Sequence, residues 1–168
     1  AADADFIIYN TCAVRENAEL RVFGNIGALK NIKRKRPDVI IGVCGCMMQQ
    51  EHIAEKIRKK YKHVDLVFGT HALYRFPQLL DGVLSGGRVF DIENEDGSVF
   101  EDITYKRDVP PLAKVPIMYG CNNFCSYCII PYLRGRVRSR NPKNVKEEIE
   151  SLSAYEVILN GINISAYN

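Results

Sequence analysis

Three cysteines, Cys121, Cys125 and Cys128, follow one another at the spacing C-x3-C-x2-C, and an aromatic residue, Tyr127, directly precedes the third. A short loop with this spacing can hold one corner of a [4Fe–4S] cluster through three thiolates, which leaves the fourth iron without a protein ligand. Such an iron can bind a substrate or a cofactor, so the spacing predicts a site of chemistry. Soft thiolates are the ligands that the cluster requires, and they bind deprotonated.

Zinc and disulfides are the simpler uses of clustered cysteines. A structural zinc site takes four ligands, commonly as two close pairs, whereas this loop has no histidine or further cysteine within thirty residues on either side. Disulfide frameworks belong to small secreted chains, and this chain is 26% charged and has no apolar signal segment. The spacing therefore favours a cluster, with zinc as the alternative.

Two further cysteines, Cys12 and Cys46, each follow a run of residues that is typical of a β-strand. Short apolar runs alternate with helical periods, which predicts parallel strands joined by crossover helices. Such sheets bind ligands beyond the carboxyl ends of their strands, so one cluster could bind both cysteines; two unrelated core cysteines are the alternative. We expect strands at 5–10, 39–43, 64–68 and 88–92, and helices at 15–35, 51–61 and 74–84.

The same pattern divides the chain into two domains and a link. We expect an α/β domain with a doubly wound parallel sheet over residues 1–92, an acidic link over 93–113 and the start of a second domain over 114–168. In the second domain we expect a strand at 114–119, a helix at 144–153 and a strand at 157–159. Because no turn or helix precedes the strand at 5–10, the first domain is expected to be incomplete at its start.

Four segments resemble the signature of the radical S-adenosylmethionine methylthiotransferases, in that family's order. They are 10–19, 45–47, 68–71 and the cysteine loop with the residues that follow it, 120–136. The resemblance covers residues 1–140 and implies an enzyme that inserts a methylthio group into transfer RNA. It also implies that residues 114–168 form the first units of a partial TIM-type barrel that is truncated here.

The resemblance implies two [4Fe–4S] clusters and S-adenosylmethionine as cofactors. Cys121, Cys125 and Cys128 correspond to the cluster that binds S-adenosylmethionine and reduces it, which yields a 5′-deoxyadenosyl radical. Cys12 and Cys46 correspond to two of the three ligands of an auxiliary cluster that takes part in sulfur insertion. The third ligand is expected upstream, in a motif that this chain does not contain.

Cys44 is a possible substitute for that third ligand, since alternate residues of a strand share a face and Cys44 precedes Cys46 by two. It follows a run of β-forming residues, however, and free cysteines are among the most buried residues. A core position is therefore favoured for Cys44.

Beyond the loop, Arg134, Arg136, Arg138 and Arg140 alternate, and an extended segment would place them on one side. Guanidinium groups there could bind RNA phosphates or the carboxylate of S-adenosylmethionine; a basic turn paired with nearby acids is the alternative. Arg134 and Arg136 are the candidate ligands among them. For Tyr127, the resemblance implies packing against the adenine of S-adenosylmethionine, and a core tyrosine is the alternative.

The resemblance leaves two substrates open. Residues 10–19 and 68–71 are similar to the branch that modifies C2 of N6-isopentenyladenosine next to the anticodon, which is favoured because this match is longer. Residues 136–140 and 161–162 are similar to the branch that acts on threonylcarbamoyl-adenosine. An alternative function of another class is a non-catalytic iron–sulfur or zinc module that only binds RNA. In addition, an incomplete barrel could leave this chain inactive by itself.

The partners that the resemblance implies are transfer RNA and an electron donor such as flavodoxin or ferredoxin. The net charge of +3 is too small to indicate nucleic-acid binding by itself. We expect a monomer without membrane association. We expect it in the cytoplasm, because exposed cluster thiolates oxidise outside a reducing compartment.

Overall fold

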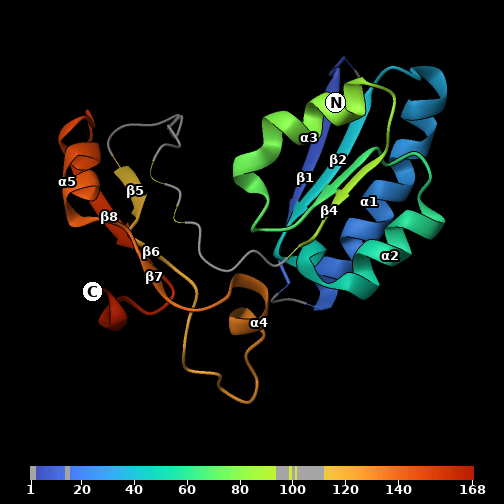
Figure 1. Cartoon of the computed structure of the whole chain (residues 1–168). Helices are drawn as coiled ribbons and strands as arrows, with labels where there is room; N and C mark the ends of the chain where they lie inside the picture. Colours follow the sequence, from blue (N-terminus) through green and yellow to red (C-terminus); the bar gives the residue numbers. More distant parts are fainter. Residues whose placement is uncertain (1–2, 14–15, 94–98, 100, 102–111) are drawn as a thin grey trace. The chain divides into compact units, whose positions relative to one another are not determined.

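The computed structural model of the chain describes residues 3–13, 16–93, 99, 101 and 112–168. The chain forms two compact units, Ala1–Glu95 and Asp96–Asn168. The first unit has one four-stranded sheet and the second has two strand pairs, each unit has its own core, and Figure 1 shows the elements of both.

The first unit is built on four parallel strands in the order β1-β2-β3-β4 (Figure 1). β1 and β2 have six residues each, and β3 and β4 have three. The predicted α/β class and the parallel arrangement are confirmed. The strands are β1 (Phe6–Thr11), β2 (Ile40–Gly45), β3 (Leu66–Phe68) and β4 (Val89–Asp91).

Helices cover both faces of this sheet. α1 (Glu16–Lys35) and α2 (Glu51–Lys60) pack on one core, to which the sheet contributes residues such as Val43 and Val67. α3 (Phe76–Leu84) packs on a second core with Leu66 and Phe68. Because successive side chains of a strand point to opposite faces, β3 supplies both cores. Two short 3-10 helices, η1 (Cys46–Gln49) and η2 (Leu73–Arg75), follow β2 and precede α3.

The second unit contains a parallel pair of strands, β5 (Leu112–Pro116) and β8 (Glu156–Asn160), with α5 (Pro142–Glu150) between them in sequence. A second, antiparallel pair consists of β6 (Met118–Tyr119) and β7 (Arg138–Ser139). The short α4 (Ile130–Arg134) follows the cysteine loop, and η3 (Ile164–Ala166) precedes the last residues.

The single strand expected at 114–119 is wrong, because Ile117 divides it into β5 and β6. The amide of Ile117 donates to the carbonyl of Asn160, the last residue of β8, at 2.9 Å. Its carbonyl accepts from the amide of Arg140, next to β7, at 2.8 Å. The backbone therefore changes partner strand at this residue.

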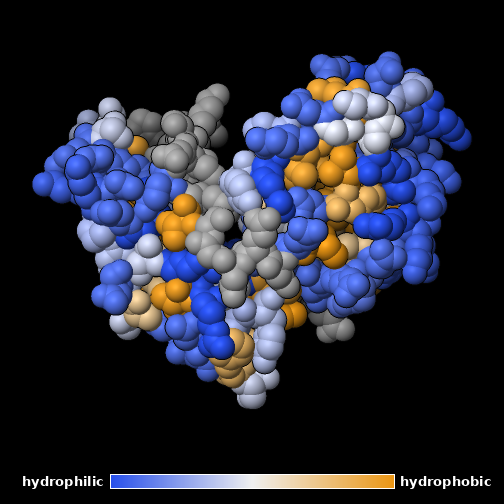
Figure 2. Space-filling model, viewed as in Figure 1, coloured by the Kyte–Doolittle hydropathy of each residue, from blue (hydrophilic) through white to orange (hydrophobic). Residues whose placement is uncertain are grey.

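The described residues of the second unit contain one parallel strand pair with its helix, so the expected barrel stays a prediction. The expected link at 93–113 lies mostly outside the described residues. In Figure 2, hydrophilic residues cover most of the visible face of each unit, and hydrophobic residues gather in smaller patches. Within the described ranges, no helix combines the length and the apolar character needed to cross a membrane.

Candidate functional site

Cys12 and Cys46 lie at the carboxyl ends of neighbouring strands. β1 and β2 run parallel with Thr11 opposite Gly45, so each cysteine is the first residue beyond an aligned pair. This is the edge at which parallel sheets bind ligands. Cys12 is exposed, whereas Cys46 is only 4% exposed at the start of η1.

Gly45 turns the chain between β2 and Cys46. Its φ is 99°, a left-handed value that residues with a side chain rarely adopt, and a Cβ here would overlap the carbonyl oxygen of Thr11. The hydroxyl of Thr11 donates to the carbonyl of Cys44 at 2.6 Å. These contacts join the ends of β1 and β2 and direct Cys46 out of the strand.

Cys44 lies in the core, as predicted. It is 6% exposed and packs with Leu66, Phe68 and Leu79 beneath α3. Burial raises the pKa of this thiol from 9.0 to about 11. Because metal ligands are thiolates, the raised pKa makes this thiol harder to deprotonate, and so a poorer ligand, than an ordinary cysteine.

A buried amide that the sequence analysis missed, Gln49, connects this edge to β3 and β4. Its Nε2 donates to the carbonyl of Ile92 at 2.7 Å, and its Oε1 accepts from the hydroxyl of Thr70 at 3.4 Å. Gly69 makes room for it, since a Cβ there would overlap the Gln49 amide. Gln49 ends η1, so the network fixes the turn that starts at Cys46. Gly69, which directly follows the strand predicted at 64–68, was the sequence signal for this close contact.

The cysteine loop leaves β6 and returns to β7 with a closed base. Gly120 has a φ of 71°, and a Cβ there would overlap the carbonyl of Arg136. The amide of Cys121 donates to the carbonyl of Gly135 at 3.1 Å. The backbone on the two sides of the loop is thus in direct contact at Cys121.

The three cysteines of the loop differ in exposure. Cys121 is buried at the base, Cys128 is half-buried, and Cys125 is exposed. A turn joins the last two, because the amide of Cys128 donates to the carbonyl of Cys125 at 2.9 Å. Two thiols are therefore accessible to solvent while the first is anchored in the unit.

The donor set of this loop fits an iron–sulfur cluster. Residues 120–136 contain three cysteines and no histidine, aspartate or glutamate, so thiolates are their strong metal donors. Across the described ranges, no group of three or more His, Cys, Asp or Glu side chains is gathered closely enough to hold a metal. Convergence of the three thiolates would accompany cluster binding, since metal binding and folding are coupled.

Three aromatic residues, Phe124, Tyr127 and Tyr132, lie in the cysteine loop and the helix that follows it. Tyr127 is 90% exposed, so it is no core tyrosine. Phe124 meets the edge of Tyr132, with ring centroids 5.4 Å apart and planes at 87°. The Cζ of Arg136 lies 4.5 Å from the centroid of Phe124.

The four alternating arginines do not lie on one side, which corrects the prediction from their spacing. α4 ends at Arg134, so the segment is not extended throughout. The guanidinium of Arg138 donates back to the carbonyls of Arg134 and Arg136, at 3.1 and 3.2 Å. The side chains of Arg134 and Arg136 are exposed, whereas Arg140 is 3% exposed.

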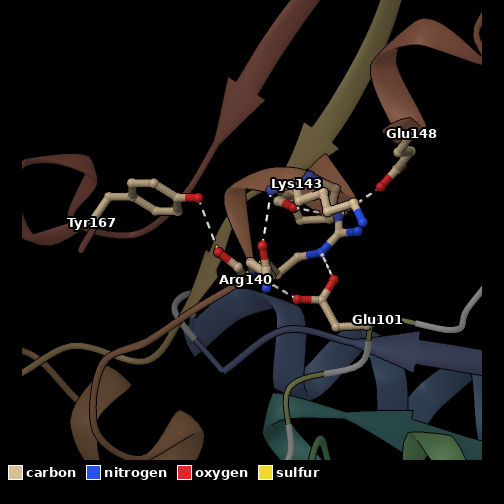
Figure 3. Close-up of polar contacts among 7 residues, drawn as sticks. Glu101, Arg140, Lys143, Glu148 and Tyr167 are labelled. Carbon is tan, nitrogen blue, oxygen red and sulfur yellow. Dashed lines mark hydrogen bonds and ion pairs between the residues drawn. The ribbon is translucent and has the colours of Figure 1, made fainter. Parts of the chain in front are cut away.

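Arg140 is the centre of a buried ion network (Figure 3). Its Nε donates to Glu101 at 3.0 Å, and its Nη1 donates to Glu148 at 2.7 Å and to the carbonyl of Pro116 at 2.8 Å. Burial alone would lower the pKa of Arg140, but the two carboxylates outweigh it and raise the pKa. The hydroxyl of Tyr167 donates to the Arg140 carbonyl at 2.9 Å. For Arg140, the alternative prediction is correct, because this arginine pairs with nearby acids.

Residues 1–69 match the family model described as "Uncharacterized protein family UPF0004". Over 98% of its length, the chain is 56% identical to the tRNA-2-methylthio-N(6)-dimethylallyladenosine synthase of Clostridioides difficile. It is 50% identical to the protein of that name from Acetivibrio thermocellus and 52% identical to that from Clostridium tetani, again over 98% of the chain. The chain is thus similar, over nearly its whole length, to relatives that share one printed name.

The family resemblance of the four motifs is thus confirmed. The chain spans 35% of the length of the Clostridioides difficile relative, 35% of the Acetivibrio thermocellus one and 37% of the Clostridium tetani one. All four motifs lie within the aligned part.

Proposed function

We propose that this chain is the part of a radical S-adenosylmethionine methylthiotransferase that carries its cluster cysteines. The whole protein would convert N6-isopentenyladenosine next to the anticodon of transfer RNA into its 2-methylthio form. The observation that carries this proposal is the 56% identity, over 98% of the chain, to a relative named as a synthase of that modified nucleoside.

Cys121, Cys125 and Cys128 would hold the radical-generating cluster. When bound, this cluster would supply the electron that cleaves S-adenosylmethionine. Cys121 would anchor it at the closed base of the loop, while exposed Cys125 and half-buried Cys128 would leave its open side accessible. Tyr127, 90% exposed beside the last ligand, would pack against the adenine of the cofactor.

Cys12 and Cys46 would be two ligands of the auxiliary cluster. Their support is the parallel register that places both directly beyond aligned ends of β1 and β2. Gly45 and Gln49 would position Cys46 through the turn and the amide network described above. Cys44 takes no part, because it is buried with a raised pKa.

The substrate assignment favours isopentenyl-adenosine over threonylcarbamoyl-adenosine. The three relatives compared above carry the dimethylallyl name, and N6-dimethylallyl and N6-isopentenyl describe the same group. We further propose transfer RNA and a reductant of the flavodoxin or ferredoxin class as partners, and a monomer in the cytoplasm as the working form.

The direct test is nucleoside analysis with the whole protein. Anaerobically reconstituted protein is supplied with S-adenosylmethionine and a reductant, and with transfer RNA that carries one of the two modified adenosines. We expect the 2-methylthio product, detected by mass spectrometry of digested RNA, from the isopentenyl substrate. Product from the threonylcarbamoyl substrate alone would overturn the substrate assignment.

A second measurement addresses the non-catalytic alternative. Release of 5′-deoxyadenosine from S-adenosylmethionine is followed for the parent protein and for Cys125→Ala. We expect release that is lost in the variant. A protein that binds RNA but contains zinc and releases no 5′-deoxyadenosine would overturn the enzymatic proposal.

A further inference from the structure

We infer that Phe124, Tyr132 and Arg136 form a platform on which an unpaired RNA nucleotide stacks beside the cysteine loop. The inference rests on the proposed function, because it names the part of transfer RNA that this surface receives. It assigns these three residues a role apart from cluster and cofactor binding.

The platform is aromatic and open. Tyr132 is 66% exposed and Phe124 is 38% exposed. Their edge-to-face contact, at 5.4 Å and 87°, fixes the two rings relative to each other. A large exposed ring is costly to solvate, and a fixed ring loses little conformational freedom when a flat ligand stacks on it.

Arg136 adds charge to these rings. Its guanidinium carbon lies 4.5 Å from the centroid of Phe124, and its side chain is exposed. Residues 120–136 contain no acidic side chain that would neutralise it. The exposed ring of Tyr132, perpendicular to Phe124, and the guanidinium over Phe124 fit a base and its phosphate, since bases stack on aromatic rings and arginines bind phosphates.

Phe124 also has an uncommon backbone conformation. Its φ is 44°, and among the described residues it is the one non-glycine with a positive φ. Bulky residues rarely adopt this strained conformation, which clusters at active sites and ligand-binding segments. The conformation presents the ring between Tyr132 and Arg136.

The occupant is an unpaired nucleotide rather than a duplex, because the faces of paired bases are covered by their neighbours in the helix. The test is fluorescence anisotropy with the full chain, prepared without iron. One probe is a fluorescein-labelled single-stranded RNA, and the other is the duplex that this RNA forms with its complement.

We expect tighter binding of the single strand. Removal of one stacking ring should weaken it about five- to tenfold in Tyr132→Ala, and by less than about twofold in Tyr132→Phe, which keeps the ring. Tyr155→Ala is the matched control, since Tyr155 is a 93% exposed tyrosine of the same unit outside the loop. It should bind like the parent. Tyr132→Leu keeps an apolar contact for Phe124 without a flat ring, and it should bind like Tyr132→Ala.

Arg136 is tested through the salt dependence of binding. In Arg136→Gln the negative slope of log K against log salt should become shallower by about 0.7, the value for one phosphate contact on a single strand. Lys146→Gln removes an exposed positive charge from α5 instead, and its slope should equal that of the parent.

Equal affinity of Tyr132→Leu and the parent for the single strand would overturn the inference. So would equal loss in Tyr155→Ala, or a duplex bound as tightly as the single strand. In chain reconstituted with its cluster, competition by S-adenosylmethionine that abolishes RNA binding would overturn it too, because the platform would then be part of the cofactor site. Because the RNA affinities of the parent and its variants are measured without iron, they do not depend on whether the proposed cluster chemistry is correct.

Discussion

At the scale of single residues, Cys44 differs from the candidate cluster ligands in its packing and not in its burial alone, because Cys46 and Cys121 are 4% and 7% exposed and Cys44 is 6% exposed. Cys12 and Cys125 are exposed, whereas Cys44 is packed with Leu66 and Phe68. Sequence spacing makes Cys44 and Cys46 look equivalent on one strand face. The left-handed turn at Gly45 distinguishes them, because it ends the alternation of the strand.

The raised pKa of Cys44 predicts a loss of stability at alkaline pH. The folded value is about 11 and the ordinary value is 9.0, so the folded chain holds this proton more tightly than the unfolded chain does. The stability linked to it is complete below pH 9.0 and is lost as the pH rises through about 11. Urea unfolding over this range should show a steeper fall for the parent than for Cys44→Ala. Cys125→Ala, which lacks an exposed thiol, should keep the steeper fall; identical slopes for all three chains would refute the burial of Cys44.

Gly45 gives a second prediction at this scale. Gly45→Ala should destabilise the first unit by about 2 kcal/mol or more, because its backbone conformation disfavours a side chain and a Cβ would overlap Thr11. Gly24→Ala is the control, since Gly24 lies in α1 with nothing within 4 Å of an added Cβ. That change should be neutral or stabilise by up to about 1 kcal/mol. Chemical denaturation measures both, and equal effects would contradict the structure of the turn.

At the scale of elements, Arg140 joins segments that the sequence separates. It contacts Glu101, Glu148 in α5 and the carbonyl of Pro116 at the end of β5. Burial alone would raise the pKa of Glu101, but hydrogen bonds from the Asn141 amide and Arg140 outweigh it and lower the pKa. The carboxylate therefore contributes stability at neutral pH that is lost as the pH falls.

Adjacent glutamates of α5 test this network. Glu148→Gln should destabilise the chain by about 2–3 kcal/mol, since it removes one carboxylate from a buried arginine. Glu147→Gln breaks an exposed pair with Lys143 and should cost less than about 0.5 kcal/mol. Thermal or urea unfolding compares them. A Glu147 variant as unstable as the Glu148 variant would show that the buried ion pair contributes no more to stability than the exposed one.

The sequence predicted most elements of the first unit because their signals are local. Apolar runs located β1 and β2 to within two residues, and helical periods located α1 and α2. The division of 114–119 at Ile117 escaped prediction, since it depends on hydrogen bonds to residues more than twenty positions away. The burial of Arg140 was not predicted for the same reason. The alternation of the arginines shows only their spacing in the sequence, while Glu101 and Glu148 become partners of Arg140 only in the folded unit.

At the scale of the whole molecule, the chain consists of two compact units with separate cores. The sheet and both helical layers of the first unit lie within Ala1–Glu95. We therefore expect residues 1–95 to unfold cooperatively as an isolated polypeptide, with circular dichroism of an α/β protein. A non-cooperative transition, or a chain without secondary structure, would show that the first unit depends on the second.

The candidate site is predictable from the sequence to a similar degree. The spacing of Cys121, Cys125 and Cys128 indicates a cluster loop, and strand positions bring Cys12 and Cys46 to one sheet edge. For Gln49, the glycine after the strand predicted at 64–68 indicated only a close approach of some side chain, and the aromatic platform had no such signal. Their roles arise from contacts with Ile92, Thr70 and Arg136 that no local pattern encodes.

If the loop cysteines bind an iron–sulfur cluster, the metal content and spectrum of the chain will show it. The chain is reconstituted anaerobically with iron and sulfide, and its iron, sulfide and zinc are measured with the electron paramagnetic resonance spectrum after reduction. We predict a brown chain whose S-adenosylmethionine-sensitive signal is lost in Cys125→Ala and kept in Cys44→Ala. A colourless chain that binds zinc, or a signal that survives in Cys125→Ala, would contradict the account.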